Sequence, residues 1–513
     1  MRQITTGEYM QLLGWISIIG YMLLLAFFAF RGARKTTSMS DFAVGSVAFS
    51  PVAVGLSLAA SITSAATFII NPGFVAYYGV SGVIAMALAL PFGALVSLIF
   101  LTKRFRTKGV SMKSLTIAQW IGERYGSKGF GTFFAFLSLL LITFVVLICV
   151  GLTKVIASTL QQEELYVLIG IVAFVFTYVM FGGANSMVYT NMIQAMLMIT
   201  VAVILIGSGY AYFTGGEGLL DRLRSIDPVL ASPLNPGSPL FRDYFEIIVC
   251  QIIVGIAVVC QPHIITKSLL LKKEKDVNQY LTTGVLAEIL FFSVVIVGLY
   301  ARIAFPDLTL NGESIGLDSV LTTYVVETLP VAVGLLVVLG LISAGLSTLE
   351  GLIQTISSTI TNDILSTVFK SKFENNPALQ VTTNRMVIVG LGVVAILLSY
   401  EQLVSPNLSV GIFAQNGVYA YFSAAFVPVL FGLFVPAVRS IVPLISAIVA
   451  LTVHFGVYYG GLTSYMEGPV RNPGIAAALA ILAAVSTALL LHWILGARNI
   501  EEAIQDKVLE ETA

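Results

Sequence analysis

Long stretches without a charged residue constrain this chain more than any other feature of its sequence. No Asp, Glu, Lys or Arg occurs in the 61 residues from Phe42 to Thr102, or in the 52 residues from Leu165 to Gly216. A membrane-crossing helix needs about 20 apolar residues, so each stretch is long enough for two spans. Charged residues make up only 11% of the chain, against about 25% in soluble proteins. We therefore expect an all-α integral membrane protein and exclude a soluble enzyme.

The balance of charges and the absence of catalytic patterns narrow the function further. The 27 Lys and Arg residues match the 27 Asp and Glu residues, so no net positive field favours nucleic acid. We find no phosphate-binding loop, cluster of metal ligands or nucleophile and base pattern of useful specificity. The lipid bilayer is the partner that composition predicts, and we expect neither an enzyme nor a nucleic-acid-binding protein.

Apolar stretches bounded by charges or by Gly, Pro and Asn turns predict 13 transmembrane helices. Their approximate limits are 9–30, 47–77, 80–102, 127–158, 163–181, 188–213, 244–268, 277–304, 321–362, 380–400, 406–436, 440–461 and 472–496. Because 13 is odd, the termini should lie on opposite faces. The loops on the side reached after the first helix hold 20 Lys and Arg residues, and the other side holds 7. The positive-inside rule then predicts a multi-pass plasma (cytoplasmic) membrane protein with its N-terminus outside and its C-terminus cytoplasmic.

Two of these helices carry residues that interrupt regular helix. The second contains Asn71-Pro72-Gly73, and the seventh contains Gly255 and Pro262. Irregular backbone at membrane depth survives only where it is buried or lines a watery cavity, and paired interruptions in corresponding helices of two halves indicate a transporter site. The alternative is that these residues have no such role, because Pro and Gly are common in membrane helices.

A cluster of neutral oxygens in the ninth helix is typical of a site for a small hard cation. In Ala344-Gly-Leu-Ser347-Thr348, each hydroxyl can lie near the carbonyl three or four residues earlier. Further ligands could be carbonyls released where a facing helix unwinds. The candidate is the Ser- and Thr-rich segment from Gly55 to Phe68.

Taken together, several segments resemble the sodium:solute symporter family. They are Ser57 to Phe68, Leu115 to Gly126, Phe181-Gly182-Gly183 through Gln194, Gln261-Pro262-His263-Ile264, Ser347-Thr348-Leu349 through Asp363, and Phe426-Val-Pro428. The resemblance runs from Thr36 to about Ala450. It implies a 5+5 inverted-repeat core made of the second to eleventh helices, with one helix before and two after. The Gln-Pro-His-Ile segment is more similar to the proline, pantothenate and monocarboxylate branches than to the sugar branch.

The resemblance divides the chain into six parts. These are 1–46, the first helix and a cytoplasmic loop; 47–213, the first five-helix repeat; 214–243, an extracellular loop; 244–436, the second repeat; 437–497, two peripheral helices; and 498–513, a cytoplasmic tail.

The resemblance also assigns a sodium site. Its ligands would be the carbonyls of Ala60, Thr63 and Ala344 and the hydroxyls of Ser347 and Thr348. The sequence itself shows no strong helix breaker at Thr63, and these hydroxyls could instead join helices to one another.

Two departures from the family pattern make this site neutral. Many members carry Asp where this chain has Asn191, and some carry Asp where it has Ile62. We therefore expect one Na⁺ per cycle, bound by dipoles.

Several titratable residues in apolar stretches need separate interpretation. Glu350, close to the sodium ligands, could be a gate or exit carboxylate that meets the released ion, or could form a salt bridge with a basic residue on the cytoplasmic side. Lys154, Glu246, Glu288 and Arg302 lie near predicted helix ends, where charged side chains can reach the interface. His263 is interpreted as a hydrogen-bonded structural residue.

Polar side chains on the interrupted helices and on the eleventh helix are candidates for binding the solute. They are Ser57, Ser61, Ser64, Thr67, Asn71, Gln251, Gln261, Gln415 and Asn416. No Lys or Arg is expected at mid-depth, which disfavours a large acid that needs a bidentate clamp. We rank small monocarboxylate or amino-acid-like solutes first.

The resulting hypothesis is a symporter, a monomer or weak oligomer, that imports a small solute with Na⁺ by alternating access. One alternative is a proton-coupled carrier of a small carboxylate. Another, from a different class, is a transporter-like solute sensor, for which we expect no room because 15 residues follow Arg498.

Overall fold

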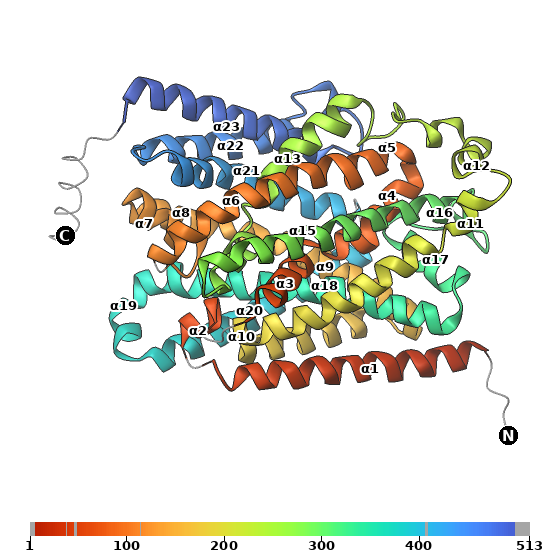
Figure 1. The fold of residues 1–513 in the computed structure, drawn as a ribbon, viewed down its shortest axis with the longest axis horizontal. Coiled ribbons are helices and arrows are strands. Elements are labelled where there is room, and N and C mark those ends of the chain that lie inside the picture. The colour runs from red at the N-terminus through yellow and green to blue at the C-terminus, as the bar shows by residue number, and fades with distance from the viewer. Residues whose placement is uncertain (1–5, 37, 46–48, 113, 406–408, 498–513) are drawn as a thin grey trace.

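Helices that run along one common direction build nearly the whole molecule (Figure 1). The structure is a computed structural model and describes residues 6–36, 38–45, 49–112, 114–405 and 409–497. Within these residues, ten helical stretches are long and apolar enough to cross a membrane, and the number rises to twelve if each of two bent helix pairs is counted as one span. The expectation of a helical, multi-pass membrane protein is confirmed at this level, whereas the count of 13 and the 5+5 repeat stay predictions.

Each long stretch is a single helix or a chain of short ones. The long helices are α1 (Thr6–Ala33), α6 (Leu90–Met112), α9 (Ile142–Leu160), α10 (Glu164–Gly207), α15 (Val277–Ser293), α18 (Val331–Thr359), α20 (Pro377–Val404), α21 (Val410–Phe434), α22 (Ile441–Gly460) and α23 (Pro473–Leu495). Shorter helices are α2 (Met39–Val44), α5 (Val80–Val83), α7 (Ile117–Tyr125), α8 (Lys128–Leu137), α11 (Tyr210–Thr214), α12 (Leu219–Ile226), α16 (Val297–Ala304), α17 (Val320–Thr328) and α19 (Ser366–Asn375).

Turns of 3₁₀ or π geometry join or cap these helices. They are η2 (Ile84–Ala89), η3 (Ser138–Leu141), η4 (Pro228–Ala231), η7 (Glu274–Asp276), η8 (Val294–Ile296), η9 (Leu317–Ser319), η10 (Ile360–Leu365) and η11 (Ser464–Met466). One small departure from a purely helical chain is a ribbon in which β1 (Thr309–Leu310) pairs antiparallel with β2 (Glu313–Ser314). The predicted tail, 498–513, lies outside the described residues.

Two stretches are bent where the chain leaves helical geometry. The first joins α3 (Pro51–Ile62) to η1 (Ala66–Ile70) and α4 (Asn71–Tyr78) with a bend of 56°. The second joins η5 (Phe245–Cys250) and α13 (Gln251–Val258) to α14 (Pro262–Ile265) and η6 (Thr266–Leu270) with a bend of 61°. α3 packs against α10, α15 and α18, so the first bend lies inside the bundle.

The location of the first bend differs from what its breaker residues predict. Asn71 and Pro72 begin α4, which continues directly from η1, and Pro is tolerated at the start of a helix. The bend lies instead at Thr63–Ala65. In the second bent pair, Pro262 does begin α14, whereas Gly255 lies within α13, where a Cβ atom would meet the Leu90 carbonyl oxygen of α6 at 2.2 Å. Gly255 is therefore a packing residue and not an interruption.

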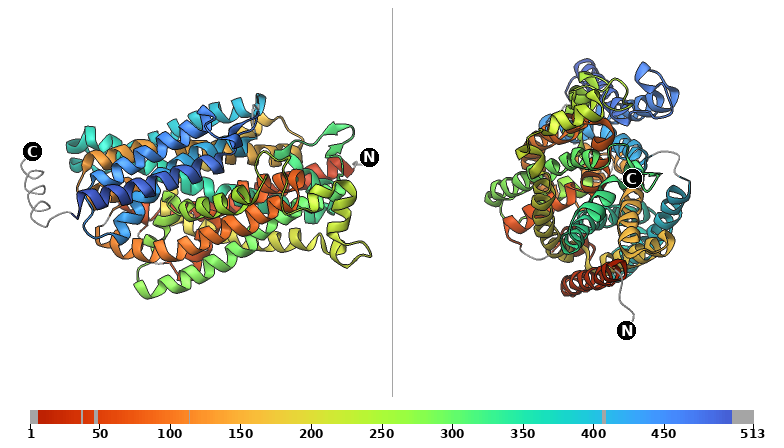
Figure 2. Two further views of the ribbon diagram at one scale, coloured as in Figure 1. Left: turned by 90° about the horizontal axis from the view of Figure 1, so that it is seen from above. Right: turned by 90° about the vertical axis from the view of Figure 1, so that its right-hand side faces the viewer.

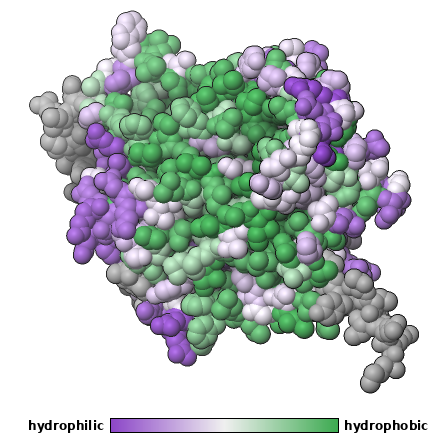
Figure 3. Space-filling view, turned by 45° about the vertical axis from the view of Figure 1, so that its right-hand side comes forward, coloured by the Kyte–Doolittle hydropathy of each residue, from purple (hydrophilic) through white to green (hydrophobic). Residues whose placement is uncertain are grey.

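The charged segments lie at the two ends of the bundle. Figure 3 shows an apolar belt between two hydrophilic ends. Figure 1 and Figure 2 show that α1 begins at one end of the bundle and that α23 (Pro473–Leu495) ends at the other. Hydrogen bonds from Thr107 to Glu274 and from Thr116 to Asp363 join three basic segments, 103–128, 267–275 and 363–385, at one end. We call this the basic end.

Candidate functional site

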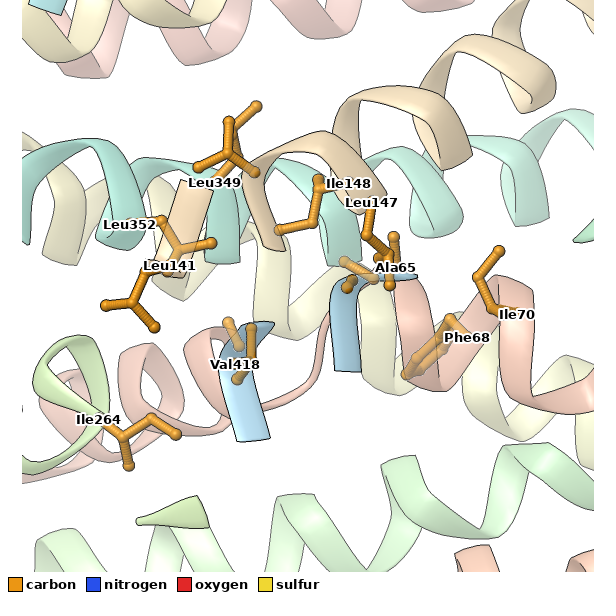
Figure 4. Packing of buried hydrophobic residues seen from close by; sticks show 14 of the residues in the cluster. Ala65, Phe68, Ile70, Leu141, Leu147, Ile148, Ile264, Leu349, Leu352 and Val418 are labelled. Atoms are coloured by element: carbon orange, nitrogen blue, oxygen red, sulfur yellow. The ribbon is translucent and has the colours of Figure 1, made fainter. Parts of the chain in front are cut away.

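The bend in α3 leaves backbone carbonyls at its end without helical partners. α3 begins with Ser50 as its N-cap and Pro51 in its first turn, and it ends at Ile62. Thr63 has extended backbone angles, φ −82° and ψ 110°. The last carbonyls of a helix lack an intrahelical donor, so they are free to bind other groups. Figure 4 shows apolar residues of this region, including Ala65 and Phe68, together with Leu147 and Ile148 of α9 and Leu349 of α18.

Two hydroxyls of α18 lie among these carbonyls. The Ser347 hydroxyl donates to the Ala60 carbonyl at 2.6 Å and lies 3.1 Å from that of Ala344. The Thr348 hydroxyl lies 3.2 Å from the Thr63 carbonyl and 3.5 Å from those of Ala60 and Ala344. Both side chains are completely buried. The structure thus brings together all five residues that the resemblance assigns to the sodium site.

The chemistry of this oxygen cluster fits a small cation. Two hydroxyl groups have only two protons to donate, while the Ala60, Thr63 and Ala344 carbonyls offer several acceptor lone pairs. A hard cation prefers oxygen ligands of this kind. Because buried acceptors without donors are unfavourable, a Na⁺ ion would satisfy the lone pairs that the hydroxyl protons leave over.

A buried carboxyl group lies behind the first bend. The Thr63 hydroxyl donates to Glu288 Oε2 at 2.9 Å, and Glu288 Oε1 has no hydrogen-bond partner among the described residues. Glu288 is completely buried within α15. The interpretation that Glu288 reaches the membrane interface was therefore wrong, because the side chain points into the bundle against the bend.

A lysine on the second bent pair lies deeper than its sequence position indicates. Lys267 Nζ donates to the Ser57 hydroxyl at 2.8 Å and to the Ser57 carbonyl at 3.3 Å, and only 3% of the residue is exposed. The sequence placed Lys267 at the end of the predicted seventh helix, in the charged run that continues to Lys275, and did not predict that its side chain would be buried. Since Pro262 restarts the helix, Lys267 remains inside the bundle as part of η6.

Asn191 of α10 lies next to the same segment of α3. Its side-chain amide donates to the hydroxyls of Ser57 and Ser61, both at 3.2 Å. Ser57 and Ser61 are completely buried and do not line the larger cavity described below. Their hydroxyls join α3 to α10 and η6, while the Ser61 carbonyl lies 3.3 Å from the Thr348 hydroxyl.

Glu350 is held by hydrogen bonds and not by a salt bridge. Its carboxylate accepts from Tyr178 at 2.5 Å, Thr190 at 2.6 Å and Gln194 at 2.8 Å. No Lys or Arg nitrogen of the described chain lies within 4 Å of it. The salt-bridge interpretation of Glu350 was therefore wrong, and the carboxylate borders a small cavity shared with Met187 and Gln354.

A cavity of about 110 Å³ lies between the two bends. We call it the amide cavity, after Asn71, Gln251, Gln261 and Gln415, which line it together with Ser64 and Thr67. Two of its polar atoms, Asn71 Oδ1 and Gln261 Oε1, have no hydrogen-bond partner among the described residues. Asn416, which the sequence also predicted to bind the solute, does not line this cavity. Its side chain donates to the Tyr459 hydroxyl and contacts His454. A ligand in this cavity would therefore meet unpaired amide groups.

The segment between α22 and α23 covers the amide cavity at the end opposite the basic end. Asn472 lines the cavity and donates to Glu246 Oε1 at 3.1 Å, and Glu246 pairs with Arg242 at 2.6 Å. Tyr465 donates to Asp243 at 2.6 Å, and this hydrogen bond raises the pKa of Tyr465 to about 12, so the phenol remains a donor at neutral pH. We call these five residues, Arg242, Asp243, Glu246, Tyr465 and Asn472, the latch.

Comparisons with known proteins agree with this architecture. Residues 42–449 match the Sodium:solute symporter family. The chain is 25% identical over 406 residues to a sodium/pantothenate symporter of Haemophilus influenzae, covering 77% of this chain and 80% of that protein. It is 25% identical over 424 residues to a high-affinity proline transporter of Bacillus subtilis, covering 80% and 84%.

A similar fold is found in a solved structure. This is a substrate-bound, outward-open Na⁺-coupled sialic acid symporter, with a TM-score of 0.73 and 17% identity, covering 93% of this chain and 98% of the other. At this level of identity the likeness concerns the fold alone.

Proposed function

Since the chain belongs to the sodium:solute symporter family, we propose that it imports a small organic solute together with one Na⁺ per cycle by alternating access. The observation that carries this proposal is the convergence of oxygens from Ala60, Thr63, Ala344, Ser347 and Thr348 at a bend between α3 and α18. We assign the basic end to the cytoplasm, with the N-terminus outside, because positively charged loops are retained on that side.

In the proposed cycle, Na⁺ binding precedes solute binding. An ion between Ala60 and Thr348 connects α3 to α18, and it thereby fixes the bend whose next residues, Ser64 and Thr67, line the amide cavity. A solute that binds the ordered cavity then binds more tightly in Na⁺. By thermodynamic linkage, the solute must raise Na⁺ affinity by the same factor.

The solute that we propose is a small monocarboxylate or an amino-acid-like molecule. The amide cavity offers neutral donors and acceptors, and the relatives are named for transport of pantothenate and proline, both of which carry one carboxylate. Glu350, which borders a cavity near the basic end, is proposed as the carboxylate that meets Na⁺ on release.

The test begins with purified protein and a metabolite screen. Thermal stability is measured for each compound in Na⁺ and in K⁺, because a ligand that binds the native state stabilises it by mass action. A compound that stabilises only in Na⁺ is then tested for uptake into proteoliposomes with an inward Na⁺ gradient.

Three outcomes separate this proposal from its rivals. Uptake that follows the Na⁺ gradient supports the symporter. Uptake that is unchanged in K⁺ but follows a pH gradient would identify a proton-coupled carrier. Binding without any uptake would indicate a sensor.

A further inference from the structure

The ammonium group of Lys267 is buried, and no carboxylate of the described residues lies within 4 Å of it. Its nitrogen donates to two acceptors, both on Ser57, and an ammonium has three N–H donors. None of the ion pairs in the described residues includes Lys267. Ser57 Oγ also accepts from Asn191 at 3.2 Å, so this acceptor is shared. Glu350 interacts with Lys267 through space, but it lies beyond ion-pair distance and already accepts hydrogen bonds from Tyr178, Thr190 and Gln194. The remaining N–H donor of Lys267 therefore favours an anion bound next to it.

His263 lies one turn earlier, in the first turn of α14. It is 2% exposed, and neither ring nitrogen has a hydrogen-bond partner among the described residues. This contradicts its interpretation as a satisfied structural histidine. His263 lines the amide cavity, and it also lines a second cavity together with Lys267, Thr266, Thr116 and Gln354. We call this second space the lysine cavity.

The lysine cavity has the size of a carboxylate group. Its volume is about 30 Å³, and one water needs at least about 10–15 Å³ on this measure, so the cavity holds two waters or one carboxylate. It leads toward the basic end, because Leu115 and Thr116, which precede α7, form part of its wall. His263 is shared by both cavities, and a solute that moves from one to the other must pass it.

We propose that Lys267 and His263 form a binding station for the carboxylate of the transported solute, which makes the solute an organic anion. This inference rests on the proposed symport function and names the charge class of its substrate. The carboxylate leaves the amide cavity past His263 and pairs with the Lys267 ammonium. Met187 and Gln354 line both the lysine cavity and the cavity at Glu350, so they separate the two. The carboxylate leaves through the lysine cavity, and Na⁺ leaves through the cavity at Glu350. Opposite charges thus leave by separate routes.

Acetate and acetamide test the station in the full-length purified protein, because they have nearly the same shape and differ in charge. Each is titrated at constant Na⁺ and constant osmolarity, and the melting temperature is recorded. We expect acetate to stabilise the wild type and acetamide to have no effect. In Lys267→Met, the acetate concentration needed for half of the shift should rise at least tenfold. Lys267→Arg keeps the positive charge and should keep the acetate response.

The results that overturn the station are equally specific. It is excluded if acetate gives no shift in the wild type, if acetamide gives the same shift, or if Lys267→Met keeps the acetate response. Should Lys267→Met not fold, His263→Phe keeps a ring of similar size without nitrogens, and an unchanged acetate response in that variant excludes the station.

The same titrations separate this inference from the symport proposal. Melting temperatures in Na⁺ and K⁺, without acetate, report the sodium site alone. Stabilisation by Na⁺ without any acetate response would contradict only the station. An acetate response that needs Lys267, with identical melting in Na⁺ and K⁺, would contradict only the assignment of Na⁺.

Discussion

At the scale of single residues, Thr348 is the side chain on which the sodium assignment depends most directly. Its hydroxyl lies within 3.5 Å of four carbonyl oxygens, from Ala60, Ser61, Thr63 and Ala344, but it can donate its one proton to only one of them. Such crowding of acceptors is unfavourable in a dry interior. A cation removes this imbalance, which is why the arrangement indicates an ion site more strongly than a helix contact.

Thr348→Ala should weaken Na⁺ binding while leaving the fold intact. Removal of one oxygen ligand from a charged group costs about 1.5–3 kcal/mol, which corresponds to a roughly 10- to 150-fold higher Na⁺ concentration for half-maximal stabilisation. The measurement is a Na⁺ titration of the melting temperature at constant ionic strength. The matched control is Ser358→Ala, which removes a buried hydroxyl without a described partner from the same helix. Equal Na⁺ affinity in both variants would remove Thr348 from the site.

The residues that sequence reasoning misjudged share one physical cause. The burial of a charged side chain depends on where its helix lies in the bundle, and the local sequence does not encode this. Glu288 was placed near a helix end and Lys267 in the charged run at the end of the seventh helix, yet both are buried and donate to or accept from residues of the first bent stretch. One signal was available for Lys267, because Pro262 begins a new helical segment, and the turn that carries Lys267 follows it directly.

At the scale of elements, the two bends have different origins. Pro262 lacks a backbone N–H, so α13 cannot continue through it, and this bend could be predicted from sequence. Thr63–Ala65 contains no such residue, and its geometry depends on partners that lie far away in the chain, among them Glu288 and Thr348. Only the family resemblance pointed to Thr63. Local propensity could therefore identify one bend and not the other.

Gly183 produces a third departure from regular helix, within α10. Its backbone angles are φ 55° and ψ −156°, a combination that side chains rarely permit, and an added Cβ would lie 2.7 Å from the Phe42 ring. Gly183→Ala should therefore lower the free energy of unfolding by at least about 1–3 kcal/mol. Gly170→Ala, on the same helix with open space around it, is the control and should change stability little. Thermal melting in detergent compares the two, and equal melting temperatures would contradict the strain.

The latch joins the start of the second bent pair to the segment between α22 and α23. Glu246 is completely buried, and its loss leaves Arg242 without its carboxylate. Glu246→Ala should lower the free energy of unfolding by about 3–5 kcal/mol, the usual result of breaking a buried pair. Asp221→Ala breaks the exposed pair with Arg224 and should cost at most about 1 kcal/mol. Denaturant or thermal unfolding of both variants gives the comparison, and similar losses would show that the latch is only a surface contact.

At the scale of the whole molecule, the charge carried in one cycle follows from the two sites together. We propose one neutral site for Na⁺, and Asn191, whose amide donates to Ser57 and Ser61, supplies no carboxylate for a second ion. If the solute carries one negative charge, as Lys267 indicates, one Na⁺ and one solute cross the membrane without net charge. A zwitterion would instead carry one positive charge inward. The two cases differ in their response to membrane potential and not in their response to the Na⁺ gradient.

Uptake into proteoliposomes under an imposed potassium diffusion potential measures this difference. A potential of about 100 mV, inside negative, contributes roughly 2.3 kcal/mol per charge, or about 50-fold accumulation of a zwitterion. We expect uptake of the physiological solute to be the same with and without this potential, because the anion and Na⁺ compensate each other. A current on addition of solute would contradict this expectation. It would require a neutral or zwitterionic solute, or a second cation, and binding at Lys267 would then have to be tested with that solute. The control is dissipation of the Na⁺ gradient, which should abolish accumulation in either case.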